Sequence, residues 1–588
     1  MQILSSLLQD MASRAIVRAW PDVQADPELL IAEVIHSTSP QFGHYQCNSA
    51  LKIGKALKKN PREIAQRIVD HLERDTPEGT PLLTRVEIAG AGFINMTLAP
   101  AFLEAQVEKC LTDAYLGASI PLAKQRIVVE FSSPNVAKEL HVGHLRSTII
   151  GDCLARVMEF LGHDVLRLNH IGDWGTQFGM LITYMQEEHP EVLHGETVVE
   201  LSELMKWYRA SKVRFDNDTD FKKKAQLRVV ALQGGDLETI EAWRKICAIS
   251  RAAFAEIYRV LDVALVERGE SFYNPLLPKI VADLEKKGLI TISGGAKCVF
   301  MDGFVGREGE PLPMIVQKSD GGYNYDTTDM AALWHRLHEE KAQRIIYVTD
   351  AGQSLHFQMI FKAGELAGFY DPKRVRLDHV PFGVVLGADG KKFKTRSGET
   401  EKLIDLLTEA VDRARAIMAE RIPEASPEEI EKMAEILGID AVKYADLSCH
   451  RVKDYMFSYE RMLKFEGNTA AFLLYAYVRV QGIKRKIGKS IDSLIGKEHI
   501  LLEHPSEIAL ALHIRQFGEA IDMVDRELLP NRLCDYLYNL AEKFHAFFRD
   551  CRVEGDEREA SRLLLCEATG RVLQKGLSLL GLRTLDRM

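Results

Sequence analysis

Two histidines, His141 and His144, stand three positions apart in the string SSPNVAKELHVGHLRST, with Gly143 between them. The string follows the apolar run Arg126–Phe131, and the pattern predicts a strand, a tight turn and then a helix. A helix start exposes N–H groups and the positive end of the helix dipole, which both suit a phosphate. At this spacing the imidazoles share one face, can donate to phosphate oxygens and can be cationic near neutral pH. Because Gly143 lets a base or phosphate approach the backbone, the motif predicts a nucleotide triphosphate site that stabilises the α-phosphate during displacement.

A second candidate is the string DGKKFKTRSGE, Asp389–Glu399, which follows the strand-like run VPFGVVLG. Its glycines and lysines predict a mobile basic loop. Such a loop suits a pyrophosphate leaving group, because the charge on that group develops only towards the transition state.

Short β-rich runs separated by helix-length segments must position these motifs. RIVVEFS, DVLRLNHIG, RIIYVTDAG and VRLDHVPFG alternate with helical stretches, which predicts a parallel sheet with crossover helices. A charged helical stretch at about 190–290 interrupts the alternation and is interpreted as an insertion. Residues 1–112 mix helices with a strand pair that turns at Gly90 and Gly92. Past residue 401 the strand signal disappears, a helix-start signal occupies 422–429, and the rest is helical.

Composition narrows the class of protein. With 588 residues, 46% hydrophobic and 27% charged, the chain is typical of a soluble globular protein with several domains. Neither a signal peptide nor a membrane-spanning run is evident. The nine cysteines lack Cys-x-x-Cys spacing, which argues against a zinc site and favours a reducing cytoplasm. The net charge of −9 does not exclude a nucleic-acid partner, since basic runs at 51–62 and 482–489 could line a groove.

Four longer strings carry a resemblance to a known family. EFSSPNVAKELHVGHLRSTIIGD, NHIGDWGTQFGM, YDTTDMA and KKFKTRSG are similar to segments of class I aminoacyl-tRNA synthetases, and specifically of arginyl-tRNA synthetases. The likeness spans essentially the whole chain, and the first string is highly specific. One departure is that KKFKTRS is a degenerate form of the usual Lys-Met-Ser-Lys-Ser signature.

The resemblance implies an α/β multidomain architecture. A Rossmann-type parallel-sheet catalytic domain would occupy 113–400, with the helical insertion at about 190–290. An α+β domain for the tRNA elbow (D-loop) would precede it at 1–112. A helical connector at 401–450 and an all-helical anticodon-binding bundle at 451–588 would follow it.

The implied reaction has two steps. The carboxylate of L-arginine attacks the α-phosphorus of ATP, giving arginyl-adenylate and pyrophosphate, and the 2′-OH of the terminal adenosine of tRNA(Arg) then attacks the activated carbonyl. The protein would catalyse the reaction by positioning the reactants and by supplying charge. ATP is expected to bring Mg²⁺, no protein-bound zinc is expected, and the enzyme is expected to be a cytoplasmic monomer without a membrane partner.

The resemblance assigns the phosphates of ATP to His141, His144 and the helix start, with Gly143 under the adenine. Lys138 would replace the charge missing from the degenerate signature. Lys394 and Arg396 are the preferred catalytic cations of the loop. The loop residues that could contact ATP are Lys391, Lys392 and Lys394.

Recognition of arginine requires carboxylates and a flat aromatic wall, because a guanidinium is a planar, charged fork of five N–H donors. Glu130, Tyr325, Asp329 and Trp174 have suitable side chains, and Tyr325 and Asp329 share a helix face. The family pattern places Tyr325 and Asp329 on the guanidinium with Glu130 beside them. It also assigns the substrate's amino and carboxylate groups to two further positions, Asn135 and Gln353.

Aromatic and polar residues beside basic runs predict the contacts with tRNA. Tyr45, Gln46 and Asn48 in the first domain could stack on, and bond to, an exposed loop nucleotide. Aromatics interleaved with cations in the last domain could stack on anticodon bases. The candidates there are Tyr475, Tyr477, Arg479, Tyr538 and the terminal Met588.

Two alternatives remain open at this point. A class I synthetase for cysteine or glutamate is disfavoured by the absence of Cys-x-x-Cys and by the acidic candidate pocket. A catalytically silent tRNA-binding or scaffold protein of the same fold is disfavoured because the histidine motif, Tyr325 and Asp329 are all present.

Overall fold

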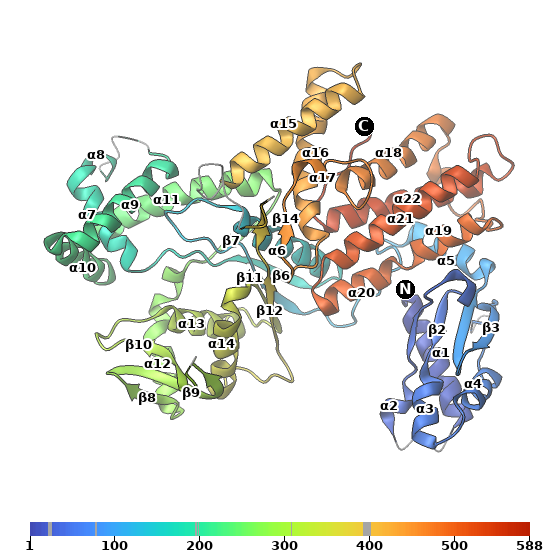
Figure 1. The fold of residues 1–588 in the computed structure, drawn as a ribbon, viewed down its shortest axis with the longest axis horizontal. Coiled ribbons are helices and arrows are strands. Elements are labelled where there is room, and N and C mark those ends of the chain that lie inside the picture. Colours follow the sequence, from blue (N-terminus) through green and yellow to red (C-terminus); the bar gives the residue numbers. More distant parts are fainter. Residues whose placement is uncertain are drawn as a thin grey trace. The chain divides into compact units, whose positions relative to one another are not determined.

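The computed structural model describes residues 1–20, 26–76, 79–193, 197, 199–306, 308–387, 389–391 and 402–588. The chain forms two compact units (Figure 1). The central unit comprises Ala123–Leu463 and Leu580–Leu582, and the terminal unit comprises Met1–Leu122, Lys464–Leu579 and Arg583–Met588. Within the described ranges, every helix is too short or too polar to cross a bilayer.

A five-stranded parallel sheet forms the middle of the central unit, in the order β12-β11-β5-β6-β7. The sheet confirms the predicted alternation of strands and helices. The first strand of this sheet along the sequence, β5, lies in its middle. The next strands, β6 and β7, lie on one side of β5, and the later strands, β11 and β12, lie on the other. The β5–β11 junction is therefore a topological switch point, where the carboxyl ends of the strands open a crevice for ligands. The strands are β5 (Arg126–Glu130), β6 (Asp164–Asn169), β7 (Val266–Glu267), β11 (Arg344–Asp350) and β12 (Arg376–Phe382).

Three helices carry the residues of interest beside this sheet: α6 (Val142–Phe160), α13 (Tyr325–His338) and α14 (Ser354–Leu366). Apolar side chains of α13 and α14 pack with those of the sheet strands in one buried core. Both helices therefore have fixed positions relative to the sheet.

The insertion differs from its prediction. Helices occupy Thr176–Val260 rather than 190–290, and a three-stranded antiparallel sheet that the sequence did not suggest lies further along the chain. The helices are α7 (Thr176–Glu188), α8 (Pro190–Leu193), α9 (Leu201–Asn217), α10 (Thr219–Gln233) and α11 (Leu237–Val260). The segments that follow are η3 (Glu270–Leu276), α12 (Leu277–Lys286), β8 (Ile290–Ser293), β9 (Ala296–Val305) and β10 (Pro311–Gln317).

Helices follow the sheet, as predicted, and the helix-start signal is confirmed. Ser426 and Glu429 form a capping box at the start of α16, each side chain accepting from the other's backbone N–H. The elements here are α15 (Leu403–Arg421), α16 (Pro427–Leu447), α17 (Tyr459–Met462) and the parallel strand pair β13 (Val385–Leu386) and β14 (Tyr455–Met456).

Two buried cations connect α16 to the rest of the central unit. Arg146 on α6 forms a 3.0 Å ion pair with Asp446 and donates to the carbonyl of Gly383 at 2.7 Å. Lys443 donates to the carbonyl of Leu261 at 2.8 Å and also to that of Gly581. The short segment Leu580–Leu582 thus contributes a hydrogen-bond acceptor to the interior of the central unit.

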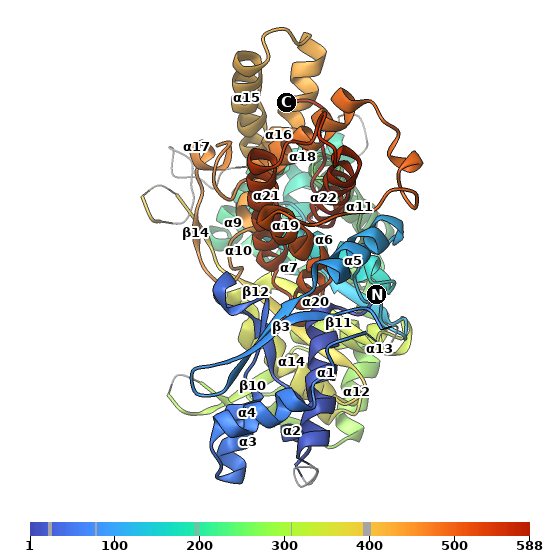
Figure 2. The same cartoon turned by 90° about the vertical axis from the view of Figure 1, so that its right-hand side faces the viewer.

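The terminal unit contains the predicted α+β and all-helical parts (Figures 1 and 2). Its antiparallel sheet has the order β1-β2-β4-β3, and the predicted turn at Gly90 and Gly92 joins β3 to β4. The strands are β1 (Val34–His36), β2 (Tyr45–Cys47), β3 (Leu83–Ala89) and β4 (Phe93–Leu98). The first helices are α1 (Leu4–Ala19), α2 (Pro27–Leu30), η2 (Pro40–Phe42), α3 (Ser49–Leu57), α4 (Pro61–Asp70) and α5 (Pro100–Thr112). The later helices are α18 (Ala470–Ile487), η5 (Ile491–Ser493), α19 (Pro505–Arg515), α20 (Phe517–Glu527), α21 (Asn531–Asp550) and α22 (Glu559–Leu579).

Candidate active site

The turn between β5 and α6 has a strained backbone. Ser132, Ser133 and Ala137 have φ values of 69°, 47° and 61°, in the left-handed region that residues with a Cβ avoid. The fold holds them there, because their N–H groups donate to the side chains of Ser147, Asn169 and Ser250, respectively, at 3.0 Å in each case. Backbone strain that surrounding hydrogen bonds maintain is typical of functional sites.

The two histidines cap the start of α6 together, as the predicted strand–turn–helix requires. His141 Nδ1 accepts from the N–H of Gly143 at 3.0 Å, and His144 Nδ1 accepts from the N–H of His141 at 3.1 Å. Because each Nδ1 acts as an acceptor, the neutral form of each ring carries its proton on Nε2, the nitrogen that can donate. The ring centroids lie 4.0 Å apart, so the two donors are neighbours.

His144 is neutral near neutral pH, although the sequence alone allowed either a neutral or a cationic imidazole. Burial, followed by the charges of His141 and Lys138, lowers the pKa of His144 to about 3. The group therefore offers an N–H and no charge throughout the physiological range. Lys138 is exposed, and its charge is felt by His144, so this lysine can supply positive charge near the turn.

Gly143 has no room for a side chain. A Cβ there would lie 2.9 Å from Cε1 and 3.1 Å from Nδ1 of His141. We expect Gly143→Ala to displace that ring and raise the KM for ATP by about fivefold, since a lost helix cap costs about 1 kcal/mol. Pyrophosphate exchange at varied ATP measures the effect. Gly482→Ala on α18, where a Cβ meets open space, is the matched control, and equal KM values in both variants would contradict the prediction.

A cluster of ionisable groups surrounds the start of α13. His356 on α14 lies between two carboxylates, with Nε2 at 2.6 Å from Asp329 Oδ2 and Nδ1 at 3.2 Å from Asp326 Oδ1. His170, which follows β6, lies 3.7 Å from the other oxygen of Asp329. The exposed Tyr325 packs its ring against His356 at 5.2 Å between centroids.

The electrostatics of this cluster suit a cationic ligand. Burial works against a charged His356, but its hydrogen bonds to Asp326 and Asp329 raise its pKa to about 9. Burial likewise works against a charged Asp329, but the hydrogen bond from His356 and the charge of His170 keep its pKa below the ordinary value. Asp329 is therefore ionised, and the charge of His170 already attracts it. His356 occupies the position beside Asp329 that a second cation could take.

Glu270, at the start of η3, is an acidic residue that the sequence analysis missed. Burial, and then the charges of Asp329 and Asp173, raise the pKa of Glu270 to about 8. No cation forms an ion pair with it in the part of the chain that the structure describes. A guanidinium placed between Glu270 and Asp329 would supply the missing charge. The signal in the sequence was an acid shortly after a short strand, three residues beyond the end of β7.

Titration of Glu270 predicts how arginine affinity depends on pH. In the free protein this carboxyl is mostly protonated at neutral pH, whereas a bound guanidinium favours its ionised form, so binding releases a proton. We expect the KM for arginine to fall as the pH rises from about 6.5 to about 8.5, by at most about tenfold per unit. Glu270→Gln should flatten this slope. An identical pH profile in the variant would show that another group titrates.

Glu130 already has a partner within the protein. Its Oε2 lies 2.5 Å from a guanidinium nitrogen of Arg336, and both side chains are almost fully buried. A buried acid with an internal cation has little charge left for a ligand. Contact between Glu130 and a substrate guanidinium remains a prediction, and the pairing favours a supporting role.

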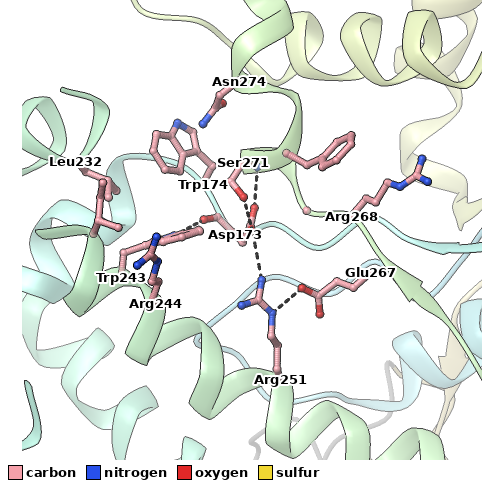
Figure 3. A pocket seen from close by; sticks show the side chains of 13 residues that line it. Asp173, Trp174, Leu232, Trp243, Arg244, Arg251, Glu267, Arg268, Ser271 and Asn274 are labelled. Carbon is pink, nitrogen blue, oxygen red and sulfur yellow. Dashed lines mark hydrogen bonds and ion pairs between the residues drawn. The ribbon is translucent and has the colours of Figure 1, made fainter. Parts of the chain in front are cut away.

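The remaining candidates for arginine lie at the same edge of the sheet. Asn135 bridges to Gly172, where a Cβ would lie 2.0 Å from Asn135 Oδ1. Gln353 ends the short helix η4 (Ala351–Gln353) directly after β11 and is exposed. Trp174 packs edge-on against Trp243, with 5.9 Å between centroids, and both line a pocket of about 450 Å³ (Figure 3).

The basic loop lies largely outside the described residues. Lys392, Lys394 and Arg396 belong to the part that is not described. Lys391 is exposed, and its backbone carbonyl accepts from the N–H of Gly387 at 2.8 Å. Among the described residues, no group of three or more His, Cys, Asp or Glu side chains is arranged to hold a metal ion.

Comparison with known proteins identifies the family. The profile described as "tRNA synthetases class I (R), catalytic domain" matches residues 106–459, that of the "Arginyl tRNA synthetase N terminal domain" matches 2–98, and that of the "DALR anticodon binding domain" matches 473–588. The chain is 58% identical over 588 residues to an arginine–tRNA ligase of Protochlamydia amoebophila, covering 100% of both chains. The chain belongs to the arginyl-tRNA synthetase family.

Other relatives agree with this assignment. The synthetase is 52% identical to an arginine–tRNA ligase of Chlamydia caviae, covering 100% of this chain and 99% of that one. The structure of arginyl-tRNA synthetase from Plasmodium falciparum matches with a TM-score of 0.87 and 34% identity, and that from Thermus thermophilus with 0.79 and 25%, each covering 100% of both chains. The synthetase therefore activates arginine and attaches it to tRNA, and ATP is its nucleotide substrate.

Two of the residues predicted to contact tRNA are buried in the terminal unit, so these two assignments are wrong. Tyr45 on β2 is fully buried, and its hydroxyl donates to Glu519 at 2.9 Å. Tyr477 on α18 is 6% exposed. Neither ring can offer a face to a nucleotide. Tyr45 instead joins the N-terminal sheet to α20, whose Glu519 also pairs with His36.

The other tRNA candidates are at least partly accessible and remain predictions. Gln46, Asn48, Tyr538 and Met588 are half-buried. Gln46 donates to Asn95 at 2.7 Å. Arg479 donates to the hydroxyl of Tyr475 at 2.7 Å and lies over its ring, 4.7 Å from the centroid. This pair presents an aromatic ring and a cation together, as a stacking site for an unpaired base requires.

Proposed function

We propose that arginine and ATP meet at the carboxyl edge of the central sheet, beside the switch point. His141 and His144 donate from Nε2 to the α-phosphate of ATP, and the N-terminus of α6 adds its dipole. The carboxylate of arginine attacks the α-phosphorus, and pyrophosphate leaves towards the basic loop. The observation that carries this proposal is the pair of Nε2 donors at the start of α6, each fixed by its own Nδ1 hydrogen bond.

Arginine would bind with its guanidinium between Asp329 and Glu270 and against the ring of Tyr325. Asn135 and Gln353 would hold its amino and carboxylate groups. Glu130 and Arg336 would support this pocket from within as a buried ion pair. An analogue without the guanidinium would leave buried carboxylates unpaired, which can reduce its use by a factor of about 10⁴–10⁵.

Because His144 is a neutral donor, it does not offset the negative charge of the triphosphate. We therefore propose that ATP binds as its Mg²⁺ complex, and that Lys138 together with the cations Lys394 and Arg396 balances the remaining negative charge. Gly143 would lie under the adenine. The role of each cation is testable by exchanging it for glutamine, with pyrophosphate exchange as the measurement.

The 2′-OH of the terminal adenosine of tRNA would then attack the carbonyl of the adenylate. Residues 1–112 are proposed to bind the elbow of tRNA(Arg), and residues 451–588 its anticodon. A cytoplasmic monomer is proposed as the working form. All nine cysteines are unpaired, as a reducing compartment would keep them, and light scattering of the purified protein tests the monomer.

A charging assay tests the proposed site. The purified protein is offered each amino acid in turn, with tRNA and ATP, and only arginine should be attached. Attachment of cysteine or glutamate, or of no amino acid, would contradict the proposal. We also expect pyrophosphate exchange with arginine to require tRNA, and full exchange without tRNA would contradict this expectation.

A further inference from the structure

A tyrosine of the helical insertion contacts the strained turn that links β5 to α6. The hydroxyl of Tyr258, near the end of α11, lies 2.8 Å from Oγ of Ser132. The same hydroxyl accepts from Nδ2 of Asn169 at 3.2 Å. Asn169 is the residue whose side-chain carbonyl accepts from the N–H of Ser133. One hydroxyl therefore reaches two consecutive residues with positive φ, the first directly and the second through an amide.

The hydrogen-bonding capacity of this hydroxyl fits both contacts. A phenol has one proton to donate, and its oxygen also accepts, so the proton is free for Ser132 while the oxygen accepts from Asn169. Burial raises the pKa of Tyr258 to about 12, which keeps the proton in place throughout the physiological range. The amide of Asn169 is thereby held in one orientation, because a flipped amide would turn its donor towards the N–H of Ser133.

The same helix supports the other end of the turn. Ser250 on α11 is fully buried, accepts from the N–H of Ala137 at 3.0 Å and donates to the carbonyl of Ile246 at 3.2 Å. Asn135 lies between the two supported ends and forms a backbone bridge to Gly172. The position of Asn135 therefore depends on side chains that α11 supplies on both sides of it.

The network also reaches the acidic cluster. His170 follows Asn169 in the chain, and its backbone N–H donates to Oγ of Ser133 at 3.3 Å. The ring of His170 lies 3.7 Å from Asp329. A displacement of Asn169 would therefore disturb both the turn and a neighbour of the proposed guanidinium site.

We propose that Tyr258 is a positioning residue for arginine, whose hydroxyl holds Ser132 and Asn169 so that the turn presents Asn135 to the amino acid. The proposal rests on the proposed function, which assigns Asn135 to the amino and carboxylate groups of arginine. ATP should be affected far less, because the two histidines at the start of α6 cap that helix through hydrogen bonds of their own.

Tyr258→Phe in the full-length protein tests this role, since it removes the hydroxyl and keeps the ring. The measurement is pyrophosphate exchange in the presence of tRNA, with arginine and ATP varied separately. The KM for arginine should rise by about 10- to 100-fold, the cost of losing one well-aligned hydrogen bond to a charged group. The KM for ATP should change by less than about twofold. Tyr370→Phe removes a hydroxyl that donates to the carbonyl of Phe361 at 3.0 Å, and this matched control should have the constants of the wild type.

Ser132→Gly supplies a second test. Glycine adopts a φ near 69° without strain and has no Oγ, so the turn should need Tyr258 less. Adding Tyr258→Phe in this background should raise the KM for arginine by only about threefold or less. An equal factor in both backgrounds would overturn the proposal. A fall in kcat with both KM values unchanged and a lower melting temperature would also overturn it, because a purely structural role gives that result.

Asn135→Ala separates this proposal from the proposed function. A raised KM for arginine in Asn135→Ala, without one in Tyr258→Phe, would overturn the role of Tyr258 alone. An unchanged KM in Asn135→Ala would show that the contact assigned to Asn135 is wrong, and the role of Tyr258 with it.

Discussion

Asp329→Ala should raise the KM for arginine by roughly 30- to several-thousand-fold and leave the KM for ATP nearly unchanged. Removing one partner of a desolvated charge pair costs about 2–5 kcal/mol, largely because the other charge is left without compensation. Asp329 lies where His356 and His170 converge, so its loss would also leave His356 with a single carboxylate, that of Asp326. Pyrophosphate exchange in the presence of tRNA, with arginine and ATP varied separately, measures both constants.

Two further variants sharpen this test. Asp329→Asn keeps an acceptor without its charge, so an effect close to that of alanine would assign the interaction to charge. Asp302→Ala removes an exposed acid on β9 and should behave like the wild type. A parallel rise in the KM for arginine and for ATP in Asp329→Ala would disprove a guanidinium-specific role.

His144→Ala should slow formation of the adenylate by about 10²–10³-fold, the range for removing one hydrogen-bond donor from a developing oxyanion. The affinity for tRNA should not change. Since the pKa of His144 lies near 3, its contribution is constant between about pH 6 and pH 8, and the rate ratio of wild type to variant should be constant there too. Rapid-quench single turnovers, beside a tRNA-binding assay, provide the measurements.

His71→Ala, which removes an exposed histidine at the end of α4, is the control for loss of an imidazole. A rate ratio that grows as the pH falls through 6.5 would mean that a charged imidazole acts on the phosphate. A matching loss of tRNA affinity would place the residue in tRNA binding instead.

The sequence pattern predicted the turn between β5 and α6 well, because the residues that determine it lie close together in the sequence. The apolar run before it and the two histidines that follow specified β5, the turn and the start of α6. The neutral state of His144 could not be predicted in this way, since it depends on burial by segments that are distant in the chain.

The acidic pocket was predictable only in part. Asp329 and Tyr325 share one helix, so their spacing indicated a common face. Arg336 on α13 pairs with Glu130 on β5, and the charge of Asp329 on α13 raises the pKa of Glu270 in η3. The members of each pair are far apart in the sequence, so no short-range pattern relates them.

Tyr45 was misassigned because its strand was not recognised. In β2 the burial alternates, and Tyr45 and Cys47 point inward while Gln46 is half-accessible. Nearby basic residues indicate the exposure of a side chain less reliably than this alternation does, because the alternation determines which side chains of a strand reach solvent.

The carbonyl that Gly581 presents to Lys443 has a practical consequence for anyone who edits this gene. Shortening the polypeptide from Gly581 onward would strip a buried ammonium of one acceptor, and the resulting instability could be mistaken for a defect in reading the anticodon. A purification tag fused behind Met588 leaves that oxygen in place and is the safer modification.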